Sequence, residues 1–111
     1  MPLFITQGRY TNESIKGLVA HPEDRHEIVA KLAKKAGCKL LSFYVTLGEY
    51  DFLTVTEAPS AQEASAFILA AAAGGGVTDV KTIVAMTTAE AKEAFAMASK
   101  AAGSYIPPGK A

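Results

Sequence analysis

Two runs rich in β-branched and aromatic residues, at positions 39–47 and 50–57, are separated only by Gly48 and Glu49. Residues of these kinds are enriched in β-strands. A connection of two residues is too short for a crossover, so the runs must pair as an antiparallel hairpin, and glycine at the first turn position is typical of a type II′ turn. This predicted hairpin constrains the fold more than any other feature, because it places an antiparallel strand pair in the middle of the chain.

One strand and a helical region precede the hairpin. Residues 3–10 predict a strand because they are rich in β-branched and aromatic side chains and show no helical period. The helical region that follows has two parts, because Pro22 interrupts the period and suits the first turn of a helix. We therefore expect the main helix over residues 22–36, ended by Gly37 in the left-handed conformation.

Two helices and one strand follow the hairpin. Residues 60–63 (Ser-Ala-Gln-Glu) and 87–90 (Thr-Thr-Ala-Glu) match the capping box, in which a hydroxyl and a carboxylate each satisfy a free amide at a helix start. We expect one helix to begin after the first box and end at the glycines 74–76, and another to run from the second box to about Gly103. A strand over residues 77–86 lies between them.

The resulting order, βαββαβα, predicts an α+β fold, the ferredoxin-like βαββαβ arrangement with an added C-terminal helix. Its sheet has four antiparallel strands, with two helices on one face. We expect one domain over residues 1–111, because 111 residues with 50% hydrophobic composition can build a core and no linker divides the chain. The tail from about residue 104, which contains Pro107 and Pro108, is expected to be extended.

Side chains alternate along a strand, so the two faces of the predicted sheet can be separated. The face expected beneath the helices carries Leu3, Ile5, Leu41, Phe43, Val45, Leu53 and Val55. The other face carries Phe4, Thr6, Ser42, Tyr44, Thr46, Phe52, Thr54 and Thr56. This second set is too apolar for solvent and too polar for a sealed core, so we expect it to pack against a second copy, in a homodimer or a higher even oligomer.

The composition narrows the classes of partner. Eleven basic and eleven acidic residues cancel, so neither a nucleic acid nor an anionic membrane is indicated as a partner. The N-terminal residues lack a secretion signal and no apolar run is long enough to span a bilayer, so a cytoplasmic protein is expected. Cys38 has no partner for a disulfide, and His21 and His26 lack the helical spacing of metal ligands, so we expect no metal and no cofactor.

The hairpin carries the stretch Leu-Gly-Glu-Tyr-Asp at residues 47–51, preceded by Phe43 and Tyr44 and followed by an apolar strand, a glycine-ended helix and a valine-rich strand. This pattern resembles the GYD-domain family over residues 4 to about 95; the family is named for a Gly-x-Tyr-Asp stretch. The resemblance implies a dimeric α/β barrel, in which two ferredoxin-like sheets pack face to face. It implies no particular reaction, because the family has no established general activity.

The motif residues Gly48, Tyr50 and Asp51 have structural and functional interpretations. Asp51 is predicted to lie beneath the helices on the same side as Arg9, and either to accept hydrogen bonds from amides at the start of the helical region or to pair with Arg9. Alternatively, Asp51 is a base or a ligand anchor at the edge of the sheet. Tyr50 is predicted to point the other way, toward Tyr44, where both either fill a subunit contact or orient a substrate.

His21 and Arg25 lie at the break before the main helix, where related folds open a cleft between helix and sheet. His21 is a candidate for proton transfer or ligand contact, and Arg25 for binding an anionic group. A capping or solvent contact for His21, and a nearby Glu23 or Glu27 for Arg25, explain the same residues without a ligand.

Two classes of function fit the sequence. The first is a small homo-oligomeric α/β-barrel protein that binds a small metabolite or a protein partner, because no nucleophile, acid and base converge in a recognisable pattern. The second is a cofactor-independent enzyme, of oxygenase or isomerase type, that uses the cleft between helix and sheet. Only the analogy of fold supports the second class.

Overall fold

The structure, a computed structural model, describes residues 1–110. In chain order the elements are β1 (Leu3–Tyr10), α1 (Asn12–Ala20), α2 (His26–Lys35), β2 (Lys39–Val45), β3 (Phe52–Glu57), α3 (Ala61–Ala73), β4 (Val77–Ala85) and α4 (Thr88–Ala102). The strands form one antiparallel sheet in the order β2-β3-β1-β4. This topology confirms the predicted α+β ferredoxin-like fold with an added C-terminal helix.

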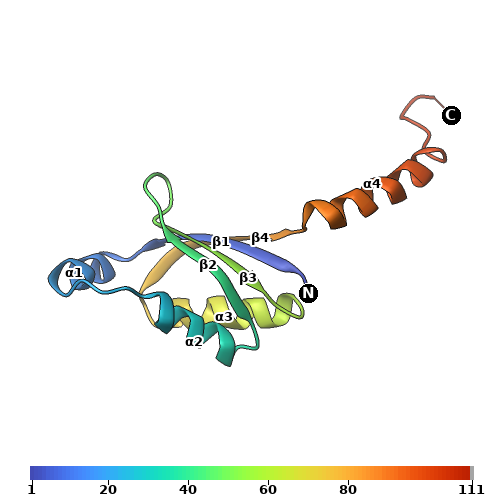
Figure 1. The fold of residues 1–111 in the computed structure, drawn as a ribbon. Helices are drawn as coiled ribbons and strands as arrows, with labels where there is room; N and C mark the ends of the chain where they lie inside the picture. Colours follow the sequence, from blue (N-terminus) through green and yellow to red (C-terminus); the bar gives the residue numbers. More distant parts are fainter. Residues whose placement is uncertain (111) are drawn as a thin grey trace.

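The helices are distributed unevenly around the sheet. Helices α2 and α3 cover one face, whereas α4 extends away from the sheet beyond the end of β4 (Figure 1). Because of this projection, the described chain measures 64 × 29 × 22 Å along its principal axes. Within residues 1–110, no helix is both long enough and apolar enough to cross a membrane.

The hairpin loop between β2 and β3 is longer than the sequence predicts. The Thr46 amide donates to the Asp51 carbonyl at 2.8 Å, and the Thr46 hydroxyl donates to the Tyr50 carbonyl at 2.8 Å. These bonds close the loop around residues 47–50, so the predicted two-residue type II′ turn is wrong. Asp51 is also bonded to β1, because its own amide donates to the Gly8 carbonyl at 2.8 Å.

Helix α2 begins at His26, so the predicted start at Pro22 is also wrong. The Asp24 carboxylate accepts a hydrogen bond from the His26 amide at 2.9 Å, which satisfies one free donor at the helix start and leaves residues 22–25 as a connection. Gly37 has the predicted left-handed conformation, with φ of 85°.

The two predicted capping boxes differ. The Thr87 and Glu90 box is confirmed, with both reciprocal bonds formed. At α3 the Ser60 hydroxyl accepts from the Gln62 amide, and it donates to the Glu63 carboxylate at 2.7 Å. The carboxylate is held by the hydroxyl, so the second half of the box is replaced by a side-chain contact.

The predicted alternation along the strands is present, but in β1 and β3 the two faces of the sheet are exchanged. Phe4, Thr6, Phe52, Thr54 and Thr56 are buried beneath the helices. Phe4 belongs to the core cluster, which also contains Ala33, Cys38, Ala58, Ala64 and Phe67. Side chains of Leu3, Ile5, Leu53 and Val55 therefore point to the uncovered face. The prediction failed because both sets are similarly apolar, so composition alone did not choose the side.

Strand β2 keeps Phe43 on the predicted helix-covered side because its register shifts between Leu40 and Ser42. Phe43 packs edge to face against Phe52, with ring centroids 6.5 Å apart. Tyr44, the next residue along the strand, faces the uncovered side. Cys38, the residue before β2, is buried in the core as a small apolar side chain, and this burial raises the pKa of its thiol.

Candidate functional site

A cavity of about 570 Å³ lies between the helix-covered face of the sheet and the helices α1, α2 and α3. Its size is in the range of sites that enclose a small molecule. Most of the wall is apolar and is made by Leu18, Ile28, Val29, Leu32, Phe43, Phe52, Phe67, Ile68, Val77 and Val80. Its polar side chains are Thr6, Tyr10, Ser14, His21, Glu23, Arg25 and Thr54. The cavity is therefore a partly open cleft with a mainly apolar wall and a few polar groups.

Three aromatic side chains from neighbouring strands form part of the cavity wall. The Phe52 ring lies between those of Tyr10, at 5.4 Å between centroids, and Phe43, at 6.5 Å. Gly8 makes this position possible, because a Cβ atom there would lie 2.5 Å from Phe52 Cζ. The pairing of Gly8 with Phe52 across β1 and β3 thus determines the position of these aromatic rings in the cavity wall.

Two threonines on adjacent strands differ in how their hydroxyls are satisfied. Thr6 and Thr82 share a hydrogen bond of 2.9 Å between their hydroxyls. Thr54, the partner of Thr6 in the sheet register, is 4% exposed, and its Oγ1 atom has no hydrogen-bond partner within residues 1–110. A buried hydroxyl without a partner costs about 1–3 kcal/mol. The cavity wall therefore contains one unsatisfied polar group.

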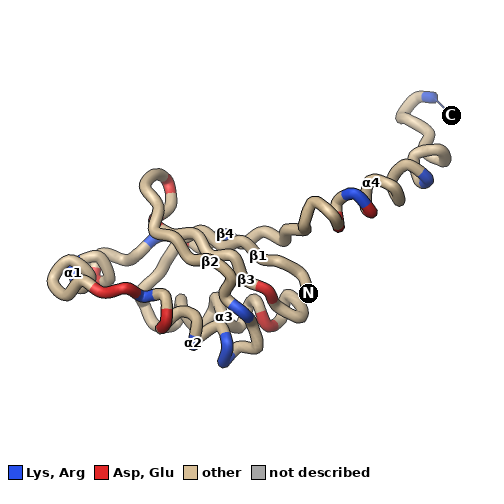
Figure 2. Tube along the Cα trace, in the orientation of Figure 1, with Lys and Arg blue, Asp and Glu red and all other residues tan. Residues whose placement is uncertain are grey.

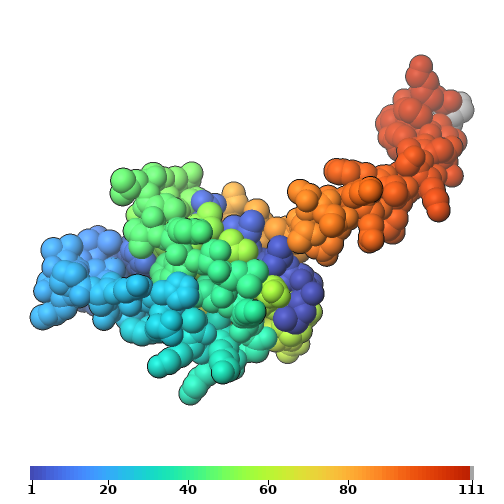
Figure 3. Space-filling model, viewed as in Figure 1, coloured from blue at the N-terminus to red at the C-terminus, as the bar shows by residue number. Residues whose placement is uncertain are grey.

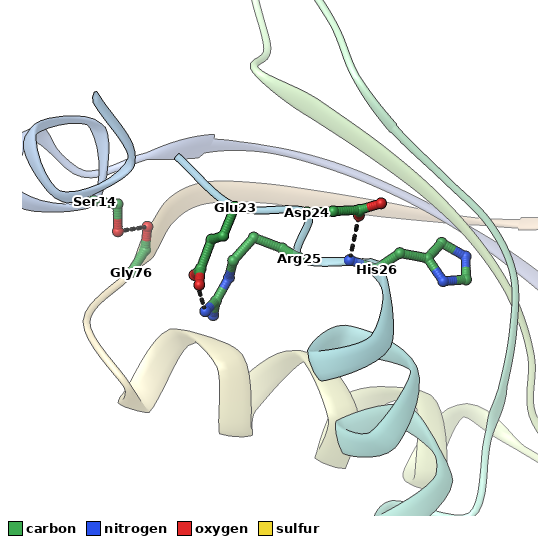
Figure 4. Close-up of polar contacts among 6 residues, drawn as sticks. All are labelled: Ser14, Glu23, Asp24, Arg25, His26 and Gly76. Atoms are coloured by element: carbon green, nitrogen blue, oxygen red, sulfur yellow. Dashed lines mark hydrogen bonds and ion pairs between the residues drawn. The ribbon is translucent and has the colours of Figure 1, made fainter. Parts of the chain in front are cut away.

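Charged residues line the side of the cavity formed by the connection between α1 and α2. Arg25 Nη1 donates to Glu23 Oε1 at 2.8 Å. Figure 4 shows these two side chains projecting from the connection toward α3. Acidic and basic residues alternate along this connection and into α2 (Figure 2). The guanidinium has five N–H donors, so the ion pair leaves donors for a second anionic group.

Tyr10 and Ser14 contribute the hydroxyl groups near this charged side. Burial raises the pKa of Tyr10, the positive charge of Arg25 opposes that rise, and the charge of Asp51 adds to it. The Ser14 hydroxyl donates to the Gly76 carbonyl at 2.8 Å, which ties α1 to the start of β4 (Figure 4). The raised pKa favours the protonated phenol, which can donate a hydrogen bond.

Of the six residues singled out in the sequence, the structure places His21 and Arg25 on the cavity wall. Arg25 also has the acidic neighbour expected for it, Glu23. Asp51, Arg9, Tyr50 and Tyr44 do not line this cavity in the described chain. The predicted site residues therefore divide into two separate regions.

The second region is the base of the hairpin loop. Asp51 Oδ2 accepts a hydrogen bond from the Tyr10 amide at 2.9 Å, one residue before the segment expected to donate. Arg9 does not form the proposed pair with Asp51; its Nε donates to the Glu49 carbonyl at 2.8 Å, and its guanidinium lies 5.8 Å from the centre of the Tyr50 ring. Because the faces are exchanged, Asp51 is not beneath the helices, and its contacts hold the loop to β1.

Sequence reasoning missed Thr54 and Phe52 as cavity residues because it assigned them to the opposite face. The signal that identifies them is the sheet register, which places Phe52 opposite Gly8 and Thr54 opposite Thr6. Among residues 1–110, no group of three or more potential ligands of the His, Cys, Asp and Glu types could hold a metal ion.

A separate exposed surface combines the uncovered sheet face with α4. Ile5, Val55 and Ile83 lie in register across three strands of that face, and Ile83 is 52% exposed. On α4, Phe95 and Met97 are 73% and 72% exposed, and no side chain of this helix is buried by residues 1–110. The space-filling view shows α4 standing clear of the rest of the molecule (Figure 3). Both parts expose apolar groups that a single chain leaves uncovered.

The fold and the site define a small ferredoxin-like protein with a cavity between sheet and helices and an exposed apolar surface. The chain belongs to the GYD domain family, whose model matches residues 4–95. It is 34% identical over 77 residues to the glutamine synthetase and cystathionine beta-lyase binding protein of Thermus thermophilus, covering 69% of this chain and 81% of that protein. The crystal structure of TTHA0845 from the same organism superposes with a TM-score of 0.51 at 14% identity, over 78% of this chain and 95% of that one. This likeness supports the fold.

Proposed function

We propose that this protein is a self-associating binding protein whose partners are metabolic enzymes. The observation that carries the proposal is the uncovered apolar surface, in which Ile5, Val55 and Ile83 align across the open sheet face. Support for a protein partner comes from the relative in Thermus thermophilus, which is named for binding two enzymes. Exposed apolar patches of this kind are typical of protein contacts.

Self-association joins two copies through their open sheet faces in a dimeric α/β barrel. The register gives each copy an aliphatic centre at Ile5, Val55 and Ile83, with Tyr44 and Leu53 paired in the next row. An aliphatic contact of this kind is stabilised by removal of apolar area from water. The hydroxyl-rich contact expected from the sequence is replaced by this one, because Thr6, Thr54 and Thr56 lie under the helices.

The projecting helix α4 provides a further contact for a second chain. A helix of 15 residues is marginally stable in water by itself, so its apolar side chains require a partner surface. Phe95 and Met97 are the principal contact residues available on it. In this proposal the sheet face builds the dimer, and α4 reaches either the second copy or the bound enzyme.

The test uses Val55→Lys, which places a charge in the middle of the open face, and Lys16→Gln on the exposed side of α1 as its control. We expect light scattering after size-exclusion chromatography to give an even oligomer for the wild type and the control, and a monomer for Val55→Lys. Interferometry with purified glutamine synthetase and cystathionine β-lyase tests the partner class. An unchanged mass for Val55→Lys contradicts the sheet-face dimer, and absence of binding to both enzymes contradicts these partners.

The cavity supports a second candidate function, the binding of a small metabolite. Its volume of about 570 Å³ and its wall of aromatic and aliphatic side chains fit a small organic molecule. A cofactor-independent enzyme of oxygenase or isomerase type is the alternative use of the same cavity, with His21 and Tyr10 as the candidate groups for proton transfer. Turnover of a bound molecule distinguishes that enzyme from a binding site.

A further inference from the structure

Thr54 is a cavity-lining residue whose hydroxyl has no hydrogen-bond partner within residues 1–110. Thr6 and Thr54 are register partners on the same face of the sheet, yet only Thr6 has a hydroxyl partner, Thr82, within residues 1–110. Thr54 is 4% exposed and lies on the cavity wall. The Thr54 Oγ1 atom is itself buried, so a polar atom of a ligand pairs with it only when the side chains around it shift.

The Arg25 side chain offers a second polar contact to a molecule bound in the same cavity. Only one of its guanidinium nitrogens is engaged in the ion pair with Glu23, and the side chains of both residues remain partly exposed. Arginine binds carboxylates through two parallel hydrogen bonds, so the free donors fit a carboxylate. His21 lies on the wall of the same cavity, and its ring N–H can also donate to an anionic group.

Apart from these polar groups, the cavity wall is apolar and favours a ligand with a hydrocarbon body. Phe43, Phe52 and Phe67 come from β2, β3 and α3, and together they present apolar surface from two sides of the cavity. Aliphatic side chains of α2 and β4, among them Val29 and Val80, complete this apolar part of the wall. A ligand here gains affinity mainly from burial of hydrocarbon, and the polar groups determine its orientation.

We propose that the cavity binds an amphipathic monoanion: an apolar molecule with a carboxylate that binds Arg25 and a hydroxyl or carbonyl group that pairs with Thr54. This inference rests on the second candidate function, the binding of a small metabolite, and names its chemical class. In this proposal Arg25 recognises the negative charge of the ligand, and Thr54 recognises a polar atom in the otherwise apolar part of the ligand.

The test measures displacement of anilinonaphthalene sulfonate, a fluorescent amphipathic anion, by four matched molecules: decanoate, ω-hydroxydecanoate, decanol and decylamine. We expect decanoate to compete about tenfold more strongly than decanol or decylamine, because a charge-assisted hydrogen bond is lost in both. We expect ω-hydroxydecanoate to compete about as well as or better than decanoate, because in this proposal its hydroxyl pairs with Thr54 and so offsets its own desolvation.

Two variants with matched controls assign the contacts. Arg25→Gln is expected to remove the preference for decanoate over decylamine, whereas Lys16→Gln retains it. Thr54→Val is expected to remove the benefit of the ω-hydroxyl, with about a fivefold loss for ω-hydroxydecanoate. Thr56→Val is the control, because its hydroxyl is also buried and unpaired in the described chain but does not line this cavity. Thr54→Val should melt at the same or a higher temperature, which separates lost affinity from unfolding.

The possible results distinguish failure of the proposed ligand class from failure of the cavity as a binding site. Equal displacement by decanoate and decylamine, or an anion preference that Arg25→Gln leaves intact, overturns the proposed class while binding in the cavity stands. A fluorescent signal that Val55→Lys abolishes and that none of the competitors reduces shows binding to the open sheet face, and it overturns both the class and the cavity function. Displacement in the predicted order with both variant effects supports the proposal.

Discussion

The backbone amide of Tyr10 donates a hydrogen bond to Asp51 Oδ2 at 2.9 Å, which joins the last residue of β1 to the residue before β3. The Asp51 amide donates in turn to the Gly8 carbonyl at 2.8 Å. Asp51 therefore contacts β1 through both its side chain and its backbone. The aspartate of the GYD stretch, in this structure, positions the hairpin against the strand that carries Tyr10.

Asp51→Ala is expected to lower the free energy of unfolding by about 1–3 kcal/mol, because the Tyr10 amide loses its acceptor in a partly buried place. Asp51→Asn should cost less, since the amide oxygen still accepts a hydrogen bond. Urea unfolding followed by circular dichroism measures both. Glu49→Ala is the control: its side chain is exposed, and the carbonyl that Arg9 uses is retained. Unchanged stability in Asp51→Ala together with loss of ligand binding contradicts the structural role.

Gly8→Ala is expected to destabilise the protein and to change the cavity. The added Cβ would lie 2.5 Å from Phe52 Cζ and 2.9 Å from Cε2, so the ring must move. Overpacking of this kind costs about 1–3 kcal/mol. Displacement of the ring alters the wall of the cavity, so the binding of anilinonaphthalene sulfonate should change in the same variant.

Gly17→Ala in α1 is the control for the stability measurement alone, because Gly17 also lines the cavity. A Cβ there meets no atom of residues 1–110 within 4 Å, and replacing a helical glycine by alanine favours the helix by about 0.5–1 kcal/mol. The double variant Gly8→Ala with Phe52→Leu should recover part of the stability lost in Gly8→Ala. Full stability of Gly8→Ala alone contradicts the close approach of Phe52 to β1.

The arrangement of elements could be predicted because its signals are local. The strand at Leu3–Tyr10 and the box formed by Thr87 and Glu90 follow from residue types at short spacing. The side of the sheet that receives the helices is not a local property. Phe52 lies under the helices because Gly8, far away in the sequence, leaves room for its ring.

The residues of the candidate site also divide into those that local sequence signals predict and those that depend on how distant strands pair. The position of His21 and Arg25 at a break between helices indicates a cleft, and the structure places both on the cavity wall. Thr54 could not be identified in this way, because its role depends on which neighbours its hydroxyl finds after the strands pair. Thr6 has the same residue type on the same face and is satisfied by Thr82 of a distant strand.

Tyr10 is expected to make stability depend on alkaline pH. Burial raises its pKa above the ordinary value of 10.0, although the charge of Arg25 opposes the rise. A raised pKa in the folded state means that folding favours the protonated phenol. This stabilisation is fully present below pH 10.0 and is lost as the pH rises through the raised pKa.

The comparison of wild type with Tyr10→Phe isolates the contribution of Tyr10, because every other ionisable group is the same in both proteins. We expect wild-type stability in urea to fall more steeply above pH 10.0 than that of Tyr10→Phe. Arg25→Gln should raise the pKa of Tyr10 further, measured by tyrosinate absorbance, because the opposing positive charge is removed. Parallel pH profiles for wild type and Tyr10→Phe contradict this assignment.

Helix α4 is expected to weaken in acid through its capping box. Glu90 Oε1 accepts from the Thr87 amide at 3.0 Å, and Thr87 Oγ1 accepts from the Glu90 amide at 3.1 Å. The hydrogen bonds to the Thr87 amide and then to its side chain lower the pKa of Glu90. A lowered pKa in the helical state gives stabilisation that is present above the ordinary value of 4.5 and is lost as the pH falls through the lowered pKa.

Glu90→Gln tests the box because glutamine does not titrate, and Glu93→Gln in the same helix is its control. We expect the helical signal in far-ultraviolet circular dichroism to decrease in acid for the wild type and for Glu93→Gln, and to stay flatter for Glu90→Gln. Thr87→Ala should weaken the helix at every pH by about 1 kcal/mol, because the free amide of Glu90 loses its acceptor. If α4 is held by a second chain, this loss also reduces self-association, since the helix must form before Phe95 and Met97 can bind. An acid transition in Glu90→Gln equal to that of the wild type contradicts the role of the box.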